Sequence, residues 1–107
     1  VKRALGMILT GRHVPAREGV DLGFVNEVVA DDALMDAARR WAAQICECAP
    51  LSVRASKDVV YRSLDTPSLE ASMQAQYESV KAMVKSEDFV EGPRAFAEKR
   101  KPEWKGR

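Results

Sequence analysis

The residues best suited to chemistry lie near the end of the chain. Between positions 94 and 107 there are two acidic residues, Glu98 and Glu103, and six basic ones: Arg94, Lys99, Arg100, Lys101, Lys105 and Arg107. Phe96 and Lys99 are three residues apart, so they share a face if this segment is helical. An aromatic ring can stack on a flat base while an ammonium group meets a phosphate. The pattern therefore favours a nucleotide-like ligand, and the alternative is a solvated terminal face.

Other candidate groups point to structural roles. His13 stands in a loop without neighbouring metal ligands, so we expect a surface residue and no metal site. Cys46 and Cys48 on one helix would point about 200° apart, so they could not hold one metal ion, and we expect them to be buried or half-buried. The adjacent acids Asp31–Asp32 and Glu87–Asp88 are typical of helix caps and dipole partners. We therefore expect no catalytic residue in this chain.

The composition is that of an ordinary globular segment. The chain has 107 residues, of which 46% are hydrophobic and 31% charged, and its formal net charge of +1 argues against a nucleic-acid partner. No apolar run approaches the roughly 20 residues that cross a bilayer, so no membrane partner is expected. The cysteine usage fits a reducing compartment, hence a cytoplasmic location. Alanine occupies many core-like positions and the first residue is not Met, so we expect a fragment that needs a partner.

The elements that must position these residues are mainly helices, which predicts the mostly α class. Apolar residues recur every three or four positions, and four or five helices are expected over Ala4–Leu9, Ala16–Leu22, Ala33–Cys48, Ser52–Leu64 and Leu69–Lys85, with a last helical turn or two over Arg94–Arg100. One short strand is predicted over Phe24–Val29, with no second strand to pair with it.

Short polar and proline motifs predict where these helices begin and end. Gly11 and Gly23 suit the left-handed position after a helix. Thr66–Pro67 is predicted to be a helix cap followed by a proline in the first helical turn, and Ser86 is predicted to cap the next helix. Gly92–Pro93 is expected to interrupt the last helix, because proline lacks an amide donor and clashes one turn back.

Several of these motifs, taken in order, resemble one known family. They are Leu9-Thr10-Gly11-Arg12 with Ala16, then Gly23 to Val29, then Pro50 with Ala55-Ser56-Lys57, then Ser86-Glu87-Asp88 with Glu91-Gly92, and finally Ala95 to Arg100 with Pro102 and Trp104. This ordered set is similar to the crotonase family, also called the enoyl-CoA hydratase/isomerase family. The resemblance extends over essentially the whole chain.

The resemblance implies that this chain is only the C-terminal helical part of a longer enzyme. The family's N-terminal part is a superhelix of β-β-α turns, absent here, whose backbone amides bind a thioester oxygen as it becomes an enolate. The implied reaction is addition, elimination or isomerisation on an acyl-CoA in fatty acid metabolism, catalysed by a lyase or isomerase. Coenzyme A enters as part of the substrate and no cofactor is bound covalently. The isolated 107-residue chain is expected to be inactive.

The resemblance also implies what residues 1–107 contribute. The family's C-terminal helices pack between subunits, as a trimer or a hexamer, and form a lid over a CoA site. By position in the last motif, Phe96 resembles the residue near the CoA adenine and Lys99 the residue that approaches its phosphate. Pro93 departs from the family pattern, and a kink there would move both. The alternative function is a non-catalytic helical module for self-association.

Overall fold

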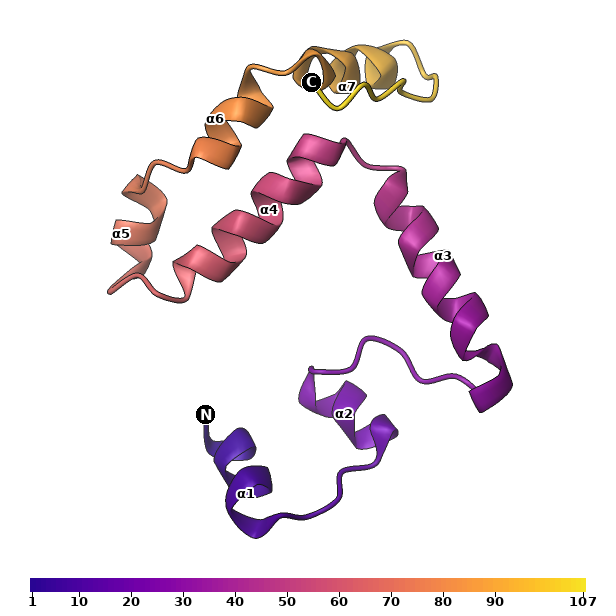
Figure 1. The fold of residues 1–107 in the computed structure, drawn as a ribbon, viewed down its shortest axis with the longest axis vertical. Helices are drawn as coiled ribbons and strands as arrows, with labels where there is room; N and C mark the ends of the chain where they lie inside the picture. The colour runs from indigo at the N-terminus through magenta and orange to yellow at the C-terminus, as the bar shows by residue number, and fades with distance from the viewer. The chain divides into compact units, whose positions relative to one another are not determined.

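The computed structural model describes all 107 residues and contains helices but no strand (Figure 1). Seven α-helices and one short 3₁₀ turn follow one another along the chain. The chain divides into two compact units, residues 1–39 and 40–107. The prediction of a mostly α chain with at most one strand is confirmed.

The first unit opens with two short helices, each closed by a glycine. Helix α1 spans Lys2–Thr10 and α2 spans Ala16–Leu22. Gly11 and Gly23 follow them with φ of 60° and 84°, so both adopt the left-handed conformation predicted for them. Glycine takes this conformation without the steric cost that a Cβ brings.

The prediction of a strand over Phe24–Val29 is wrong, because the structure has no strand there. The amides of Phe24 and Val25 both donate to the Gly19 carbonyl, at 3.1 and 3.2 Å, and so satisfy the C-terminal end of α2. These amides are therefore not free for a β-ladder, and no neighbouring strand exists to bind the rest of the segment. The β-forming side chains pack locally instead, with Val25 and Phe24 against buried Gly19.

The acids at 31 and 32 do not cap a helix with their side chains, contrary to expectation. They lie within the 3₁₀ turn Asp31–Ala33, whose N-cap is Ala30, and no side-chain oxygen accepts a bond there. Helix α3 then spans Leu34–Cys46, close to the predicted Ala33–Cys48. The boundary between the two units falls inside α3.

Helices α4 and α6 pack side by side in the second unit (Figure 1). Helix α4 spans Pro50–Ser63, with proline in its first turn, and α6 spans Glu78–Val84. Between these two helices, the Ser79 hydroxyl donates to Asp58 at 2.6 Å. This bond, with the Arg62 guanidinium at 2.6 Å, lowers the pKa of Asp58.

The single helix predicted over Leu69–Lys85 is two helices, α5 (Leu69–Gln74) and α6. Ala75 and Tyr77 have extended backbones, and the Tyr77 hydroxyl reaches back to the Ser72 carbonyl at 3.4 Å. The break lets α6 lie against α4, and this tertiary packing overrides the local periodicity. The cap of α5 is Ser68, which accepts from the Ala71 amide, and not the predicted Thr66.

Helix α7 spans Glu87–Ala97 and runs through Pro93, so the predicted interruption is wrong. A proline inside a helix costs about 3 kcal/mol, because one amide donor is lost. Two features offset this cost. Ser86 caps the helix by accepting from the Phe89 amide at 3.1 Å, as predicted. The returning chain end bonds to α7 in the turns before the proline, where the amides of Lys105 and Glu103 donate to Asp88 and Glu91.

The structure buries little apolar surface. The buried hydrophobic residues are all alanines, Ala37, Ala55 and Ala95, and no large side chain is fully buried. Long apolar side chains are instead exposed on several helices, including Leu64, Leu69 and Met73. None of the helices is both long and apolar enough to span a membrane.

Candidate functional site

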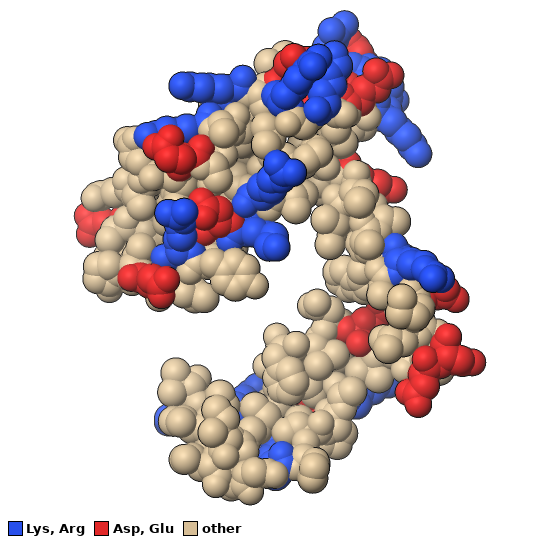
Figure 2. Space-filling model, viewed as in Figure 1, with Lys and Arg blue, Asp and Glu red and all other residues tan.

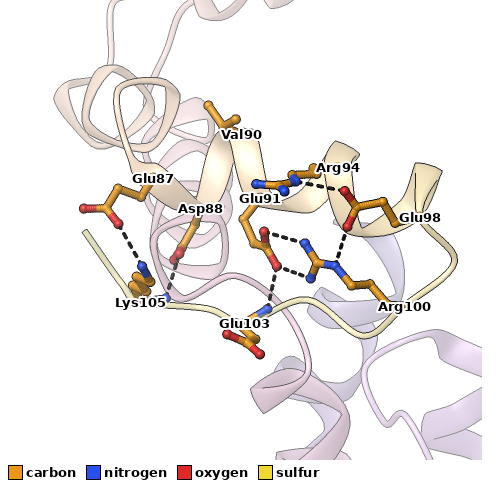
Figure 3. Close-up of a pocket in the computed structure, with 9 residues that line it drawn as sticks. All are labelled: Glu87, Asp88, Val90, Glu91, Arg94, Glu98, Arg100, Glu103 and Lys105. Carbon is orange, nitrogen blue, oxygen red and sulfur yellow. Dashed lines mark hydrogen bonds and ion pairs between the residues drawn. The ribbon is translucent and has the colours of Figure 1, made fainter.

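The last ten residues fold back along α7 and are held there by carboxylates (Figure 3). Asp88 lies in the first turn of α7 and is only 3% exposed. Its two carboxylate oxygens accept hydrogen bonds from the amides of Lys105, at 2.7 Å, and Gly106, at 2.8 Å. A buried carboxylate is costly unless it is hydrogen-bonded, and here both oxygens are satisfied.

Glu91 forms the second attachment, one helical turn along from Asp88. Its carboxylate accepts two bonds from the Arg100 guanidinium, one of them 2.9 Å long, and a third from the Glu103 amide at 2.9 Å. These donors favour the charged form, so the pKa of Glu91 falls to about 2, chiefly through Arg100. We call Asp88 and Glu91, with the amides they bind, the tail clamp.

The remaining acids beside the tail clamp neutralise most of the basic chain end. Glu98 accepts from Arg94 at 2.9 Å and from Arg100 at 2.6 Å, and these bonds lower its pKa. Glu87 pairs with Lys105 at 3.4 Å and with Arg107 at 3.1 Å. The resulting groove of about 520 Å³ is lined by Val90 and by eight charged residues, most of them paired: Glu87, Asp88, Glu91, Arg94, Glu98, Arg100, Glu103 and Lys105. Figure 2 shows acidic and basic side chains intermingled over α7.

Two cations at this end of the chain lack an ion pair. Four of the six basic residues that follow position 93 are bound to carboxylates, whereas Lys99 and Lys101 are not. Their ammonium groups are therefore the ones available to an external anion. Of the six basic residues at the chain end, four are therefore paired with carboxylates of the chain itself, and two are not.

Lys99 also has an unusual backbone. Its φ of 53° makes it the one non-glycine residue in the left-handed region. The Lys99 amide bonds to the Phe96 carbonyl at 3.2 Å and the Arg100 amide to the Ala95 carbonyl at 3.0 Å. This is the Schellman arrangement that ends helices, with lysine in the place that usually holds glycine.

The prediction that the helix continues to Arg100 is wrong, since α7 ends at Ala97 and Lys99 lies beyond it. Phe96 and Lys99 therefore do not share a helical face. They lie on one turn, where the hydrogen bond joins their backbones, and Phe96 is 87% exposed. An exposed aromatic residue and a lysine without an ion pair thus lie on the same turn of the chain, although they do not share a helical face.

Comparison with known proteins identifies the family. The family model for enoyl-CoA hydratase/isomerase matches residues 1–107. This chain belongs to the enoyl-CoA hydratase/isomerase family. A carnitinyl-CoA dehydratase from Citrobacter koseri is 42% identical in an alignment of 104 positions that covers 94% of this chain and 40% of that protein. A carnitinyl-CoA dehydratase from Proteus mirabilis is 45% identical over 105 residues, with the same coverage.

A solved structure supports the same assignment at the level of the fold. The crystal structure of an enoyl-CoA hydratase from Mycobacterium tuberculosis H37Rv matches this chain with a TM-score of 0.89 and 33% identity. The match covers 99% of this chain and 42% of that structure. The predicted crotonase-like fold class is confirmed. The chain spans about 40% of the length of the curated relatives it matches.

The cysteines and the histidine carry no metal site. Cys46 and Cys48 are both exposed, so the prediction that they are buried or half-buried is wrong. Helix α3 ends at Cys46, which leaves Cys48 in the following bend, where little covers it. His13 is exposed, as predicted, and no three His, Cys, Asp or Glu side chains are grouped to hold a metal ion.

Sequence reasoning missed the tail clamp and its tryptophan anchor. Trp104 donates from its indole nitrogen to the Glu47 carbonyl at 2.7 Å, across 57 positions of sequence. The sequence predicts an interaction of Asp88 with the helix dipole. The residues around Asp88 do not indicate its hydrogen bonds to residues 17 and 18 positions further along the chain. The one signal in the sequence is the glycine at position 106, because glycine is typical of turns. In the structure Gly106 has a φ of 72°, where the chain turns back.

Proposed function

We propose that this chain is the C-terminal helical segment of an enzyme that acts on acyl-CoA thioesters, as a lyase or isomerase. The reaction passes through an enolate whose oxygen is held by amides of an upstream β-β-α superhelix. Residues 1–107 supply no reacting group, so the isolated chain does not turn over substrate. Carnitinyl-CoA dehydratases among the relatives support a CoA thioester substrate and a water-adding or water-removing reaction. The cytoplasm and fatty acid metabolism remain the proposed setting.

Within that enzyme, Phe96 and Lys99 form part of the CoA site. The observation that carries this proposal is the exposed Phe96 ring beside Lys99, one of only two unpaired cations at the chain end. Coenzyme A offers both chemical partners, since it has a flat adenine and phosphates on one molecule. The ring stacks on the base, and the ammonium group forms a charge-assisted bond with a phosphate.

The tail clamp gives this site its rigidity. Asp88 and Glu91 hold the returning chain from residue 100 onward, while the Schellman turn holds the residues just before it. Because Lys99 lies between two fixed points, less conformational entropy is lost when it binds a phosphate. The helix continues through Pro93, so Phe96 stays on the last turn of α7.

The same enzyme is proposed to assemble as a trimer or hexamer, with these helices between subunits. Support comes from apolar side chains that no other part of the chain covers. Leu64 is 77% exposed, Leu69 77% and Met73 79%. Exposed apolar surface on this scale is typical of a face that meets another protein surface, here the upstream superhelix or a second subunit.

The CoA proposal is tested by replacing Lys99 with alanine in a protein that joins the upstream superhelix to this chain. We expect the dissociation constant for acyl-CoA, measured by calorimetry, to rise about 10-fold at low salt, and less at moderate salt. Lys85→Ala is the matched control, because Lys85 is also an exposed lysine without an ion pair. An unchanged affinity in Lys99→Ala, or an equal loss in Lys85→Ala, would rule out the phosphate contact.

The second candidate is a non-catalytic helical module that associates with itself. The small alanine core and the exposed apolar faces favour it as well. It predicts that residues 1–107 form a stable oligomer without any ligand. Sedimentation velocity distinguishes the two candidates, since a chain that stays monomeric at high concentration eliminates this one.

A further inference from the structure

The two lysines without an ion pair at the chain end flank an arginine whose side chain is fully engaged. Arg100 donates from Nε to Glu98 at 2.6 Å and from Nη2 to Glu91 at 2.9 Å, so its side chain lies against α7 (Figure 3). Lys99 and Lys101, on either side of Arg100, are both exposed. The positive charge of Arg100 is thus neutralised within the chain, whereas the charges of the two lysines are not.

The backbone around Lys101 is held on both sides. The Lys101 carbonyl accepts a hydrogen bond from Arg100 Nη1 at 3.1 Å. Pro102 favours an extended conformation of the residue before it. One residue further on, the Glu103 amide donates to the Glu91 carboxylate at 2.9 Å. A ligand that binds the Lys101 ammonium group therefore has to order only the side chain, which keeps the entropic cost of binding low.

Lys101 faces solvent on the side of the tail away from α7. In an extended segment, adjacent side chains lie on opposite sides. Because Arg100 lies against α7, the extended residue after it directs its side chain outward, in agreement with its exposure. The α-carbons of Lys99 and Lys101 are within about 7 Å of each other, since two residues span no more than that.

The segment that carries these lysines has an excess of positive charge. Glu98 is already bound to two arginines, and Glu103 is the one acid between positions 98 and 103 without an ion pair. Two unpaired cations therefore lie near one unpaired carboxylate. Such an arrangement favours an anion with more than one charged group.

The following inference rests on the proposed CoA site. We propose that Lys99 and Lys101 bind two different phosphate groups of one CoA molecule. CoA carries a 3′-phosphate and a 5′-diphosphate on the same ribose, so two anionic groups lie close together beside the adenine. With Lys99 on the 3′-phosphate, Lys101 forms a charge-assisted hydrogen bond with the diphosphate.

The test measures the dissociation constants of CoA and 3′-dephospho-CoA by calorimetry at low salt. The protein joins the upstream superhelix to this chain. Lys101→Met removes the charge and keeps most of the side-chain length. We expect it to weaken the binding of both ligands about 10-fold, because both contain the diphosphate. Lys99→Ala should weaken the binding of CoA alone.

Two control variants separate a phosphate contact from other effects of the substitution. Lys101→Arg keeps the positive charge and should bind both ligands within about 2-fold of the wild type. Lys85→Met removes another exposed lysine without an ion pair, at the end of α6, and should change neither dissociation constant. The loss in Lys101→Met should also shrink at moderate salt, since screening weakens an exposed charge contact.

The outcomes that overturn this inference differ from those that overturn the CoA site. If Lys99→Ala weakens CoA binding and Lys101→Met does not, the site stands and the second contact is refuted. If both variants show the same pattern with the two ligands, both lysines meet one phosphate group, which contradicts separate contacts. An equal loss in Lys85→Met would reduce the effect to general charge. Unchanged affinities in both Lys99→Ala and Lys101→Met would overturn the CoA site itself.

Discussion

Asp88 shows how one side chain can organise the end of this molecule. It stands in the first turn of α7, where a negative charge is favoured by the helix dipole, and it is almost completely buried. Its partners are the backbone amides of Lys105 and Gly106, and Gly106 has the left-handed φ of 72° that favours glycine. The position of the tail therefore depends on the carboxylate at 88 together with the glycine at 106.

Replacing Asp88 tests this dependence. Asp88→Ala removes both acceptors, and we expect the free energy of unfolding to fall by about 1–3 kcal/mol, the cost of unsatisfied amides. Asp88→Asn keeps one acceptor and should lose less. Urea denaturation measures both. Glu87→Ala is the control, since its ion pairs are exposed, and a loss there as large as in Asp88→Ala would refute the special role of residue 88.

Glu91 predicts a pH dependence of the tail clamp. Its pKa is about 2 in the folded chain, chiefly because of Arg100, and about 4.3 in an unfolded one. The unfolded state therefore binds more protons between these values, so the stabilisation is complete above pH 5 and is lost as pH falls toward 2. The protection factor of the Glu103 amide, which is its hydrogen-exchange rate relative to the intrinsic rate at the same pH, should fall over this window in the wild type. In Glu91→Gln the fall should be weaker, and an identical profile would contradict the assignment.

We predict that Lys99 lowers the stability of the folded chain but contributes to ligand binding. Its left-handed backbone costs a lysine about 1 kcal/mol relative to glycine, so Lys99→Gly should raise the free energy of unfolding by about that much. The same change removes the free ammonium group. Thermal denaturation measures the stability, and a destabilised Lys99→Gly would mean that the lysine side chain supports the turn itself.

At the scale of elements, the sequence predicts helices well where local signals agree. The boundaries of α1 and α2 follow from Gly11 and Gly23, and that of α7 from Ser86. The failures have two different physical causes. Phe24–Val29 is not a strand because its first amides bind the Gly19 carbonyl at the end of α2, and no second strand exists to pair with it. The break at Ala75 has no local breaker residue, and it accompanies the packing of α6 on α4, which a pattern of period 3.6 does not show.

Gly19 tests the packing of the turn that replaces the predicted strand. A Cβ at this position would lie 2.6 Å from the Val25 side chain and 3.1 Å from the Phe24 ring. We expect Gly19→Ala to destabilise the chain by about 1–3 kcal/mol in chemical denaturation, because the turn cannot shift without losing its bonds to α2. Gly6→Ala is the matched control. Its Cβ meets nothing within 4 Å, so that variant should gain about 0.5–1 kcal/mol.

At the scale of the whole molecule, the chain has many helices and a small core. Only Ala37, Ala55 and Ala95 are buried among the apolar residues, whereas Trp41, Ile45 and Leu64, which belong to the recurring apolar positions of the predicted helices, are exposed. The periodicity correctly predicted helices with an apolar side, but it could not tell whether that side is covered within the chain. The family model and the roughly 40% coverage of relatives fit a segment whose apolar faces meet other protein surface.

The candidate site was partly accessible from the sequence. Phe96 and Lys99 could be singled out by type and spacing, and the structure leaves both free. The Arg94–Glu98 pair has the i,i+4 spacing of a helical ion pair, but the neutralisation of Arg100 by Glu91 could not be read from the sequence, because it follows from the folding back of the tail. A run of basic residues alone does not tell which cations remain available to a ligand.

The central claim, that Lys99 meets a phosphate of CoA, is tested most directly by a double-mutant cycle on the full-length enzyme. The dissociation constants of CoA and of 3′-dephospho-CoA are measured for the wild type and for Lys99→Gly. If the contact is to the 3′-phosphate, the substitution weakens CoA binding about 10-fold and changes dephospho-CoA binding less than about 2-fold. An equal loss for both ligands would place the contact on the diphosphate, and no loss for either would contradict the account.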